Sequence, residues 1–93
     1  MSGKYTLIKI TKKALLRSPE LPGIYIYWSL AKNPIYVGKA INLKNRLNSY
    51  LNVRLEVKTQ KLMEDAVYFS TTLVGSEIEA LLLEAKLVRK LNP

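Results

Sequence analysis

Residues 24–28 (IYIYW) and residues 35–37 (IYV), joined by the segment 29–34 (SLAKNP), decide the fold of this 93-residue chain. Both runs consist of β-branched and aromatic side chains, which favour extended backbone. Pro34 and Gly38 mark the limits of the second run, and the segment between the runs is typical of a turn. The two runs therefore predict an antiparallel hairpin with a connection longer than two residues.

Side chains alternate between the two faces of each predicted strand. We expect the core to take the aliphatic side chains of the hairpin, which are Ile24, Ile26, Ile35 and Val37. The opposite face carries three tyrosines, Tyr25, Tyr27 and Tyr36. These phenol groups would then share one surface of the hairpin.

The elements before and after the hairpin follow from periodicity and from capping residues. Residues 4–10 alternate polar and apolar and are compatible with extended backbone, and Thr11 is a suitable N-cap for a short helix. From Ile41 onwards apolar residues recur at helical spacing, and residues 57–65 predict a further helix. Residues 66–74 predict a third strand.

A break at Gly75 precedes the last helix. Ser76 and Glu79 form an S-x-x-E capping box, so this helix is expected over about residues 77–91. The sequence thus predicts an α+β fold, with a small three-stranded, mainly antiparallel sheet flanked by helices. The length supports a single domain, residues 1–93, with one modest core.

Composition restricts both the chemistry and the location. The chain has no cysteine and no histidine, which excludes disulfides, thiolate zinc sites and thiol nucleophiles and removes the commonest general base. The longest unbroken apolar run, residues 24–28, is far too short to span a membrane. Because the N-terminus has no apolar signal region, we expect a cytoplasmic protein without membrane contact.

The charge gives the first indication of a partner. The net charge is +8, and residues 1–54 hold ten basic residues and one acid (+9), whereas residues 55–93 hold five basic residues and six acids (−1). A basic half on a small domain indicates a phosphate backbone as partner. Charge alone leaves DNA, RNA, an anionic membrane and ordinary solubilising charge open.

The acidic residues limit what metal site the chain can build. Glu77 and Glu84 lie two helical turns apart, about 10 Å, which is too far for both to grip one ion. A two-metal nuclease needs several convergent carboxylates. Any metal site would therefore be one divalent ion on a single carboxylate with waters and phosphate, which suits Mg²⁺. Glu84 has apolar neighbours and needs a partner, which is either such an ion or a cation such as Lys39 or Arg46.

Without histidine or cysteine, the candidate proton acceptors are carboxylates, lysine and tyrosine. The chain has six tyrosines and one phenylalanine. Tyr36 is followed by Lys39 and Arg46, whose charges would favour its ionised form. The alternative is that the strand tyrosines serve packing.

Three blocks of sequence resemble the GIY-YIG nuclease family. Residues 23–25 (GIY) and 36–38 (YVG) match the paired motif that names the family, with Val in place of Ile in the second half. The likeness continues through residues 39–50 and 76–93 and spans about residues 18–93. The lysine after the second motif, the tyrosine at position 50 and the run E-A-L-L-L-E-A are similar to the UvrC branch of the family.

The resemblance implies roles for the matching residues. Tyr36 would act as the general base for the attacking water or hand its proton on, and Tyr25 would hold the scissile phosphate or the water network. Arg46 would stabilise the charge that builds on phosphorus, and Lys39 would lie close to the phosphate or to the Tyr36 oxygen. Tyr50 would complete the polar site by hydrogen bonding.

The resemblance also implies a cofactor, a substrate and partners. Glu84 would be the sole protein ligand of one Mg²⁺ or Mn²⁺ ion. Four side chains are expected to bind DNA, namely Lys39, Asn42, Lys44 and Arg46. The implied function is a metal-dependent DNA endonuclease that hydrolyses a phosphodiester bond, as a strand incision in nucleotide excision repair. Other repair proteins would bind regions outside this chain, and the domain itself is expected to be a monomer.

Two other functions stay open at this point. The first is a non-catalytic nucleic-acid-binding module on the same fold, and the second is a protein-interaction domain whose charge serves only solubility. The family commonly continues beyond its final proline with a tail carrying Tyr-Asn, whereas this sequence ends at Pro93. The chain is therefore either a piece of a longer protein or a minimal version of the domain.

Overall fold

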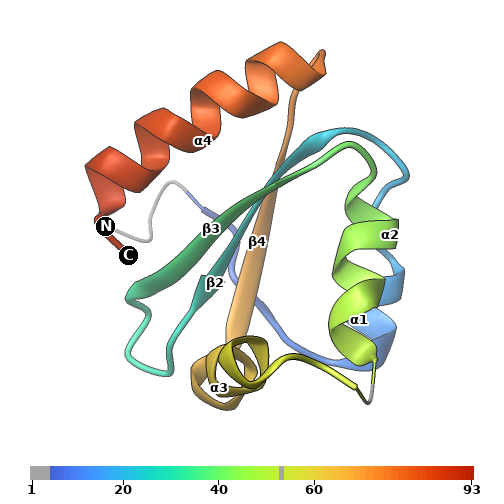
Figure 1. Cartoon of the computed structure of the whole chain (residues 1–93), viewed down its shortest axis with the longest axis vertical. Coiled ribbons are helices and arrows are strands. Elements are labelled where there is room, and N and C mark those ends of the chain that lie inside the picture. Colours follow the sequence, from blue (N-terminus) through green and yellow to red (C-terminus); the bar gives the residue numbers. More distant parts are fainter. Residues whose placement is uncertain (1–4, 53) are drawn as a thin grey trace.

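The computed structural model of the chain describes residues 5–52 and 54–93. An antiparallel sheet with the strand order β1-β4-β2-β3 lies between two layers of helices (Figure 1). The elements run along the chain as β1 (Ile8–Lys9), α1 (Lys12–Leu16), β2 (Gly23–Trp28), β3 (Pro34–Ala40), α2 (Leu43–Asn48), the 3-10 turn η2 (Ser49–Leu51), α3 (Val57–Asp65), β4 (Tyr68–Leu73) and α4 (Glu77–Leu91). The expected α+β class with an antiparallel sheet is confirmed.

The expected number of strands was wrong, because the sheet has four strands rather than three. Ile8 and Lys9 pair with Phe69 and Tyr68 and so cover the otherwise open edge of β4. This short strand falls within the segment 4–10, whose alternation is compatible with extended backbone; residue 4 lies outside the described residues. A two-residue strand is too short for alternation alone to define.

Helix capping explains why the helices begin where they do. The Thr11 hydroxyl accepts a hydrogen bond from the Ala14 N–H (3.0 Å), and the Ser76 hydroxyl accepts one from the Glu79 N–H (3.2 Å). The Glu79 carboxylate in turn accepts from the N–H of Gly75 (2.9 Å), so both members of the S-x-x-E pair satisfy free donors. The predicted helices over residues 57–65 and 77–91 are confirmed.

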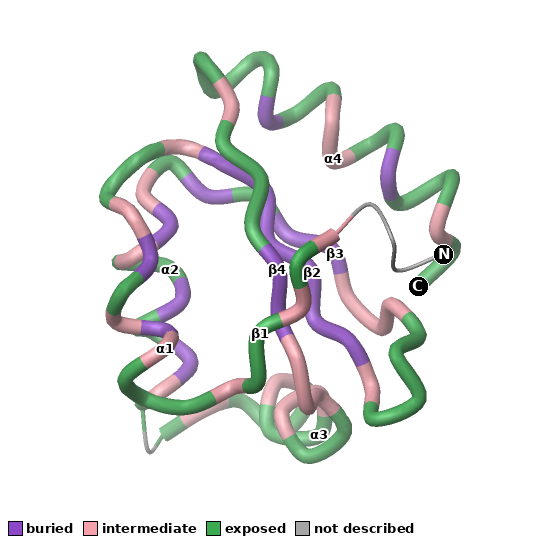
Figure 2. The backbone as a smooth tube through the Cα atoms, turned by 180° about the vertical axis from the view of Figure 1, so that it is seen from behind, coloured by how far each residue is buried: buried purple, intermediate pink, exposed green. Residues whose placement is uncertain are grey.

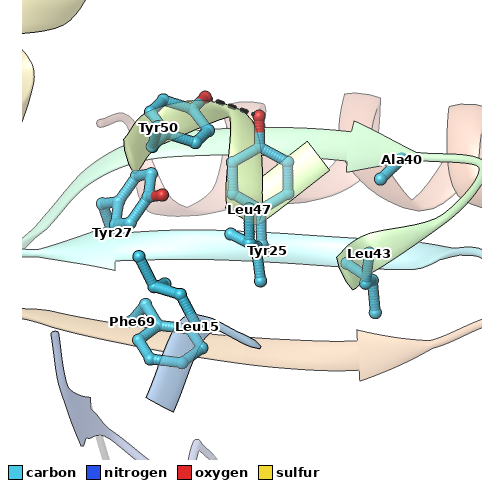
Figure 3. Packing of buried hydrophobic residues seen from close by; sticks show 8 residues of the cluster. All are labelled: Leu15, Tyr25, Tyr27, Ala40, Leu43, Leu47, Tyr50 and Phe69. Atoms are coloured by element: carbon cyan, nitrogen blue, oxygen red, sulfur yellow. Dashed lines mark hydrogen bonds between the residues drawn. The ribbon is translucent and has the colours of Figure 1, made fainter. Parts of the chain in front are cut away.

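The expectation of one core on one face of the hairpin was wrong. Every residue of β2 is buried, because α4 covers one face of the sheet while α1, α2 and η2 cover the other (Figures 1 and 2). The core on the α4 side contains Ile24, Ile26, Trp28, Val37, Ala80 and Leu87. The core on the other side contains Leu15, Tyr25, Tyr27, Ala40, Leu43, Leu47, Tyr50 and Phe69 (Figure 3). Two of the three hairpin tyrosines are therefore fully buried core residues.

Ile35 also departs from the simple alternation. The register shifts at the end of β2, where Tyr27 pairs with Tyr36 and Trp28 already pairs with Pro34. Ile35 is thus the extra residue of a bulge, and it packs against the tyrosine-side core instead of beside Val37.

In the described part of the chain, no helix combines the length and the hydrophobicity that a membrane span would require.

Candidate active site

The site is built around a hydrogen-bonded group of two tyrosines and one arginine. The Nε–H of Arg46, on α2, donates to the Tyr25 hydroxyl oxygen of β2 at 3.0 Å. The hydroxyls of Tyr25 and Tyr50 lie 2.7 Å apart (Figure 3). Arg46 Nη2 lies 3.5 Å from the Tyr50 oxygen. Tyr50 follows Arg46 by four residues, which puts both on one side of the α2–η2 segment. The sequence therefore brings guanidinium and phenol together locally, and β2 supplies the second phenol.

The two glycines of the GIY and YVG motifs make room for this packing. Gly38 pairs with Tyr25 across β2 and β3, and a Cβ on Gly38 would lie 2.3 Å from Tyr25 Cζ and 2.4 Å from its Oη. The tyrosine ring thus lies directly over the glycine backbone. A Cβ on Gly23 would lie 2.5 Å from the Thr72 carbonyl oxygen and 2.6 Å from Leu43 Cδ1. Neighbouring atoms leave no space for a larger side chain at either position. Backbone conformation is not the reason, since neither glycine has a positive φ.

Tyr36 stands beside this group and is half-buried. Its ring centroid lies 6.0 Å from that of Tyr25, in a tilted arrangement. It lines a hollow of about 470 Å³ together with Arg46 and Tyr50. The remaining lining residues are Ile35 and, from α3, Lys58, Thr59, Lys61, Leu62 and Asp65. We call this space the tyrosine hollow.

A larger groove of about 940 Å³ lies between α2 and the first half of α4, at the end of β3. It is lined by residues 39–42, by Asn45 and Arg46 of α2, by Ser49 of η2, and by Glu77, Ile78, Ala80 and Leu81 of α4. We call it the helix groove. Arg46 lines both spaces. A ligand in either space can therefore reach the same positive charge.

The structure places the residues expected to bind DNA in different surroundings. Lys39 is exposed, pairs with Ile24 in the register and lines the helix groove. The Asn42 carboxamide accepts a hydrogen bond from the Asn45 N–H (3.0 Å), which makes Asn42 the N-cap of α2 as well as a groove residue. Lys44 lines neither space, and its backbone N–H donates to the Pro19 carbonyl at 3.1 Å.

Glu84 is half-buried on the face of α4 that packs on the sheet. It stands one turn beyond Ala80 and three residues before Leu87, both of which are buried. It lines neither the tyrosine hollow nor the helix groove, but it follows the groove residues Ala80 and Leu81 by one helical turn. Among the described residues, histidine, cysteine, aspartate and glutamate form no group of three or more that could hold a metal ion. Arg46, an alternative partner considered for this carboxylate, instead bonds to the tyrosine hydroxyls.

Burial dominates the ionisation of the tyrosines. Desolvation raises the pKa of Tyr50 to about 12, against the opposing effects of the Tyr25 hydrogen bond and the Arg46 charge. Burial also raises the pKa of Tyr25 well above its ordinary value, and the Tyr50 hydroxyl adds to the effect. The hydrogen bond to Tyr25 raises the pKa of Arg46 further. At neutral pH the group is therefore two neutral phenols held by one permanent cation.

Tyr27 belongs to the same cluster, although the sequence analysis assigned it no role in the site. Its ring packs edge-on against Tyr25 (centroids 5.7 Å apart) and Tyr50 (5.0 Å). Within the described residues, its hydroxyl is the one buried side-chain oxygen or nitrogen that lacks a hydrogen-bond partner. The α3 residues of the tyrosine hollow were likewise missed, because their place beside Tyr36 depends on how α3 packs.

Comparison with known proteins identifies this arrangement. The family model described as the UvrC-like GIY-YIG domain matches residues 21–93. The UvrABC system protein C of Rickettsia canadensis is 39% identical over 93 residues, which is all of this chain and 15% of that protein. The chain thus spans about one-seventh of the length of such curated relatives.

Solved structures agree with the sequence matches. The GIY-YIG N-terminal endonuclease domain of UvrC from Thermotoga maritima, bound to magnesium as its catalytic divalent cation, has a TM-score of 0.79 and 45% identity to this chain, with 88% of this chain and 90% of that one covered. A point mutant of the same domain, also bound to its catalytic divalent cation, has a TM-score of 0.81 and 43% identity, with 88% and 89% covered.

The fold and the paired motif thus define the class of GIY-YIG endonuclease domains. Within that class, the chain belongs to the UvrC-like GIY-YIG family. The family, the fold and the enzyme class that the sequence predicted are confirmed.

Proposed function

We propose that this domain hydrolyses a phosphodiester bond of DNA with the help of one divalent cation. The observation that carries the proposal is the position of Arg46, which is held by Tyr25 and Tyr50 beside the half-buried Tyr36. In such an arrangement the fixed guanidinium can stabilise charge on a phosphate, and the adjacent accessible phenol can transfer a proton.

Each residue of the group has a step in this reaction. A water oxygen bonds to phosphorus while the bond from phosphorus to the leaving oxygen breaks. Tyr36 takes up the proton that the water releases while it passes its own hydroxyl proton on to solvent, and the leaving oxygen takes a proton from solvent. The charge of Arg46 stabilises the phosphate oxygens as negative charge builds on them. Tyr25 and Tyr50 fix the guanidinium through its Nε and Nη2 atoms. Lys39 contacts the phosphate backbone next to Arg46 in this proposal, which is supported by the fact that both residues line the helix groove.

The cation is proposed as Mg²⁺ or Mn²⁺, held by Glu84. The relatives from Thermotoga maritima contain a catalytic divalent cation, which is magnesium in one case. A single half-buried carboxylate suits a hard ion that keeps most of its waters. When bound, such an ion polarises the phosphate and neutralises part of its charge.

The biological setting is proposed from the relatives. Since the curated relatives are UvrABC system proteins C, we propose that the domain makes a strand incision in nucleotide excision repair in the cytoplasm. DNA is the substrate, the domain acts as a monomer, and other repair proteins bind regions outside residues 1–93.

A nicking assay on supercoiled plasmid, with Mg²⁺, Mn²⁺ or EDTA, tests the proposal. We expect metal-dependent nicking that falls at least about 100-fold in Tyr36→Phe and in Glu84→Gln, which is typical of losing a catalytic acid–base group or a metal ligand. Tyr68→Phe and Glu64→Gln are matched controls, because neither residue lines the two spaces, and both variants should nick like the parent. Nicking retained in Tyr36→Phe and Glu84→Gln would refute the site. Salt-sensitive DNA binding without nicking would instead indicate a non-catalytic binding module.

A further inference from the structure

The helix α3 turns a charged face toward the proposed catalytic residues. Lys58, Lys61, Leu62 and Asp65 all line the tyrosine hollow. They follow the i, i+3, i+4, i+7 spacing of one helix face. A helix that served only packing would place apolar residues there, whereas this face carries two lysines and one apolar side chain.

The way α3 packs on the domain leaves the side chains of Lys58 and Lys61 accessible to a ligand. Leu62 and Met63 pack against the tyrosine-side core, but no residue of α3 is buried (Figure 2). Lys58 and Lys61 are exposed, and within residues 5–52 and 54–93 neither makes an ion pair or a side-chain hydrogen bond. Their charges are therefore not neutralised by the fold.

The charge inside the hollow favours an anion. Lys58, Lys61 and Arg46 contribute three positive charges and Asp65 one negative charge, a net of +2. The cations come from two helices, because Arg46 lies on α2 whereas Lys58 and Lys61 lie on α3. A chain of phosphates can contact several separated cations at once, whereas a single phosphate group satisfies only one or two of them.

We infer that Lys58 and Lys61 bind backbone phosphates of the nucleic-acid strand next to the scissile phosphate, so that the strand runs through the tyrosine hollow between β3 and α3. The inference rests on the proposed function, and it adds α3 to the substrate-binding surface. Lysine suits this role because its ammonium is a compact charge that binds phosphate without demanding one geometry. The contact is made to the backbone and carries no sequence preference.

DNA binding to the 93-residue chain, measured by fluorescence anisotropy with a short labelled duplex in EDTA, tests the inference without any cleavage. The variant carries Lys58→Gln and Lys61→Gln together. We expect its affinity to fall about 10-fold or more at low salt, and the slope of log K against log salt to become smaller by about 2, because two phosphate contacts are lost. In the cleavage assay with Mg²⁺, KM should rise while kcat stays close to that of the parent.

The matched control carries Lys12→Gln and Lys13→Gln, which removes the same charge from exposed positions on α1 that line neither space. Its salt slope should remain that of the parent. Arginine at positions 58 and 61 should restore the affinity, and circular dichroism should show unchanged helix content in all variants. If the variant at positions 58 and 61 binds DNA like the control, the inference is wrong.

Two further comparisons distinguish a phosphate contact of Lys58 and Lys61 from a small-anion site and from the proposed nuclease function. Inorganic phosphate, compared with chloride at equal ionic strength, should not displace the duplex selectively; selective displacement that depends on Lys58 and Lys61 would show a small-anion site and overturn the inference. A parent that binds DNA through these lysines but never nicks would refute the proposed function while supporting the phosphate contact. A parent that nicks DNA, but whose DNA affinity does not depend on Lys58 and Lys61, would support the proposed function and refute the phosphate contact.

Discussion

At the scale of single residues, the site rests on phenol groups that the fold has buried. Tyr25 is both a fully buried core residue and the acceptor of the Arg46 hydrogen bond. The cost of burying its hydroxyl is offset because this hydroxyl also forms a hydrogen bond with Tyr50 (2.7 Å). Tyr27 is buried to the same extent in the same cluster, yet its hydroxyl has no partner among the described residues. Of these two neighbouring tyrosines on one face of β2, the hydroxyl of Tyr25 is hydrogen-bonded and that of Tyr27 is not, among the described residues.

This contrast predicts opposite effects of removing the two hydroxyls. Tyr27→Phe should leave the free energy of unfolding unchanged or raise it by about 1 kcal/mol, because a buried unsatisfied group is removed. Tyr25→Phe should lower it by about 1–3 kcal/mol, because Arg46 and Tyr50 lose a shared partner. Urea denaturation of the two variants measures the difference. A loss in Tyr27→Phe as large as that in Tyr25→Phe would show that the Tyr27 hydroxyl is satisfied, for example by a buried water.

At the scale of elements, the position of the tyrosines depends on how β2 and β3 pair. The register places Gly38 opposite Tyr25, and the ring fills the space that a side chain on Gly38 would need. The bulge at the other end of the pair turns Ile35 toward the tyrosine-side core. The hairpin therefore shapes the site through close packing as well as through the residues it carries.

Gly38→Ala should displace the Tyr25 ring, because the new methyl group would lie 2.3 Å from Tyr25 Cζ. Overpacking of this kind costs about 1–3 kcal/mol of stability, and nicking should fall with the loss of the Arg46 hydrogen bond. Gly75→Ala is the control, since its Cβ would meet only the end of the Glu79 side chain at 3.2 Å. Urea denaturation and the nicking assay compare the two. Equal stability of the two variants would contradict the close-packing role of Gly38.

At the scale of the whole molecule, the proposed site draws on both sides of the sheet. Tyr25, Tyr36, Arg46 and Tyr50 gather with α2 and η2 on one side, and Glu84 comes from α4 on the other. Arg46 lines both spaces, and residues of α3 line the tyrosine hollow. The site therefore exists only when the whole domain is folded.

The buried phenols make the stability of the whole domain sensitive to alkaline pH. Tyr50 titrates at about 12 in the folded chain and the pKa of Tyr25 is raised as well, whereas an unfolded tyrosine titrates near 10. Above pH 10 the unfolded state binds fewer protons than the folded state, so stability falls as pH rises. The contribution of Tyr50 should be complete below pH 10 and be lost between about pH 10 and 12. Urea midpoints across this range measure it, and Tyr50→Phe should show a shallower fall; equal slopes would contradict the assignment.

The sequence by itself determined the features that depend on neighbouring residues. The hairpin, the Thr11 and Ser76 caps, the helices over residues 57–65 and 77–91 and the family motif could all be read from it, because strand alternation, helical spacing and caps act over a few residues. The local link from Arg46 to Tyr50 belongs to the same class, since four residues make one helical turn.

The tertiary structure alone decided which faces are covered and which residues meet. The tyrosine face of the hairpin became a second core because α1 and α2 pack on it, and the short strand β1 formed because β4 offered an open edge. Lys58 and Lys61 look like solvated helix charges in the sequence, and only the packing of α3 beside Tyr36 brings them to the tyrosine hollow. The physical reason is that burial and proximity depend on contacts between segments far apart in the chain, which no local pattern records.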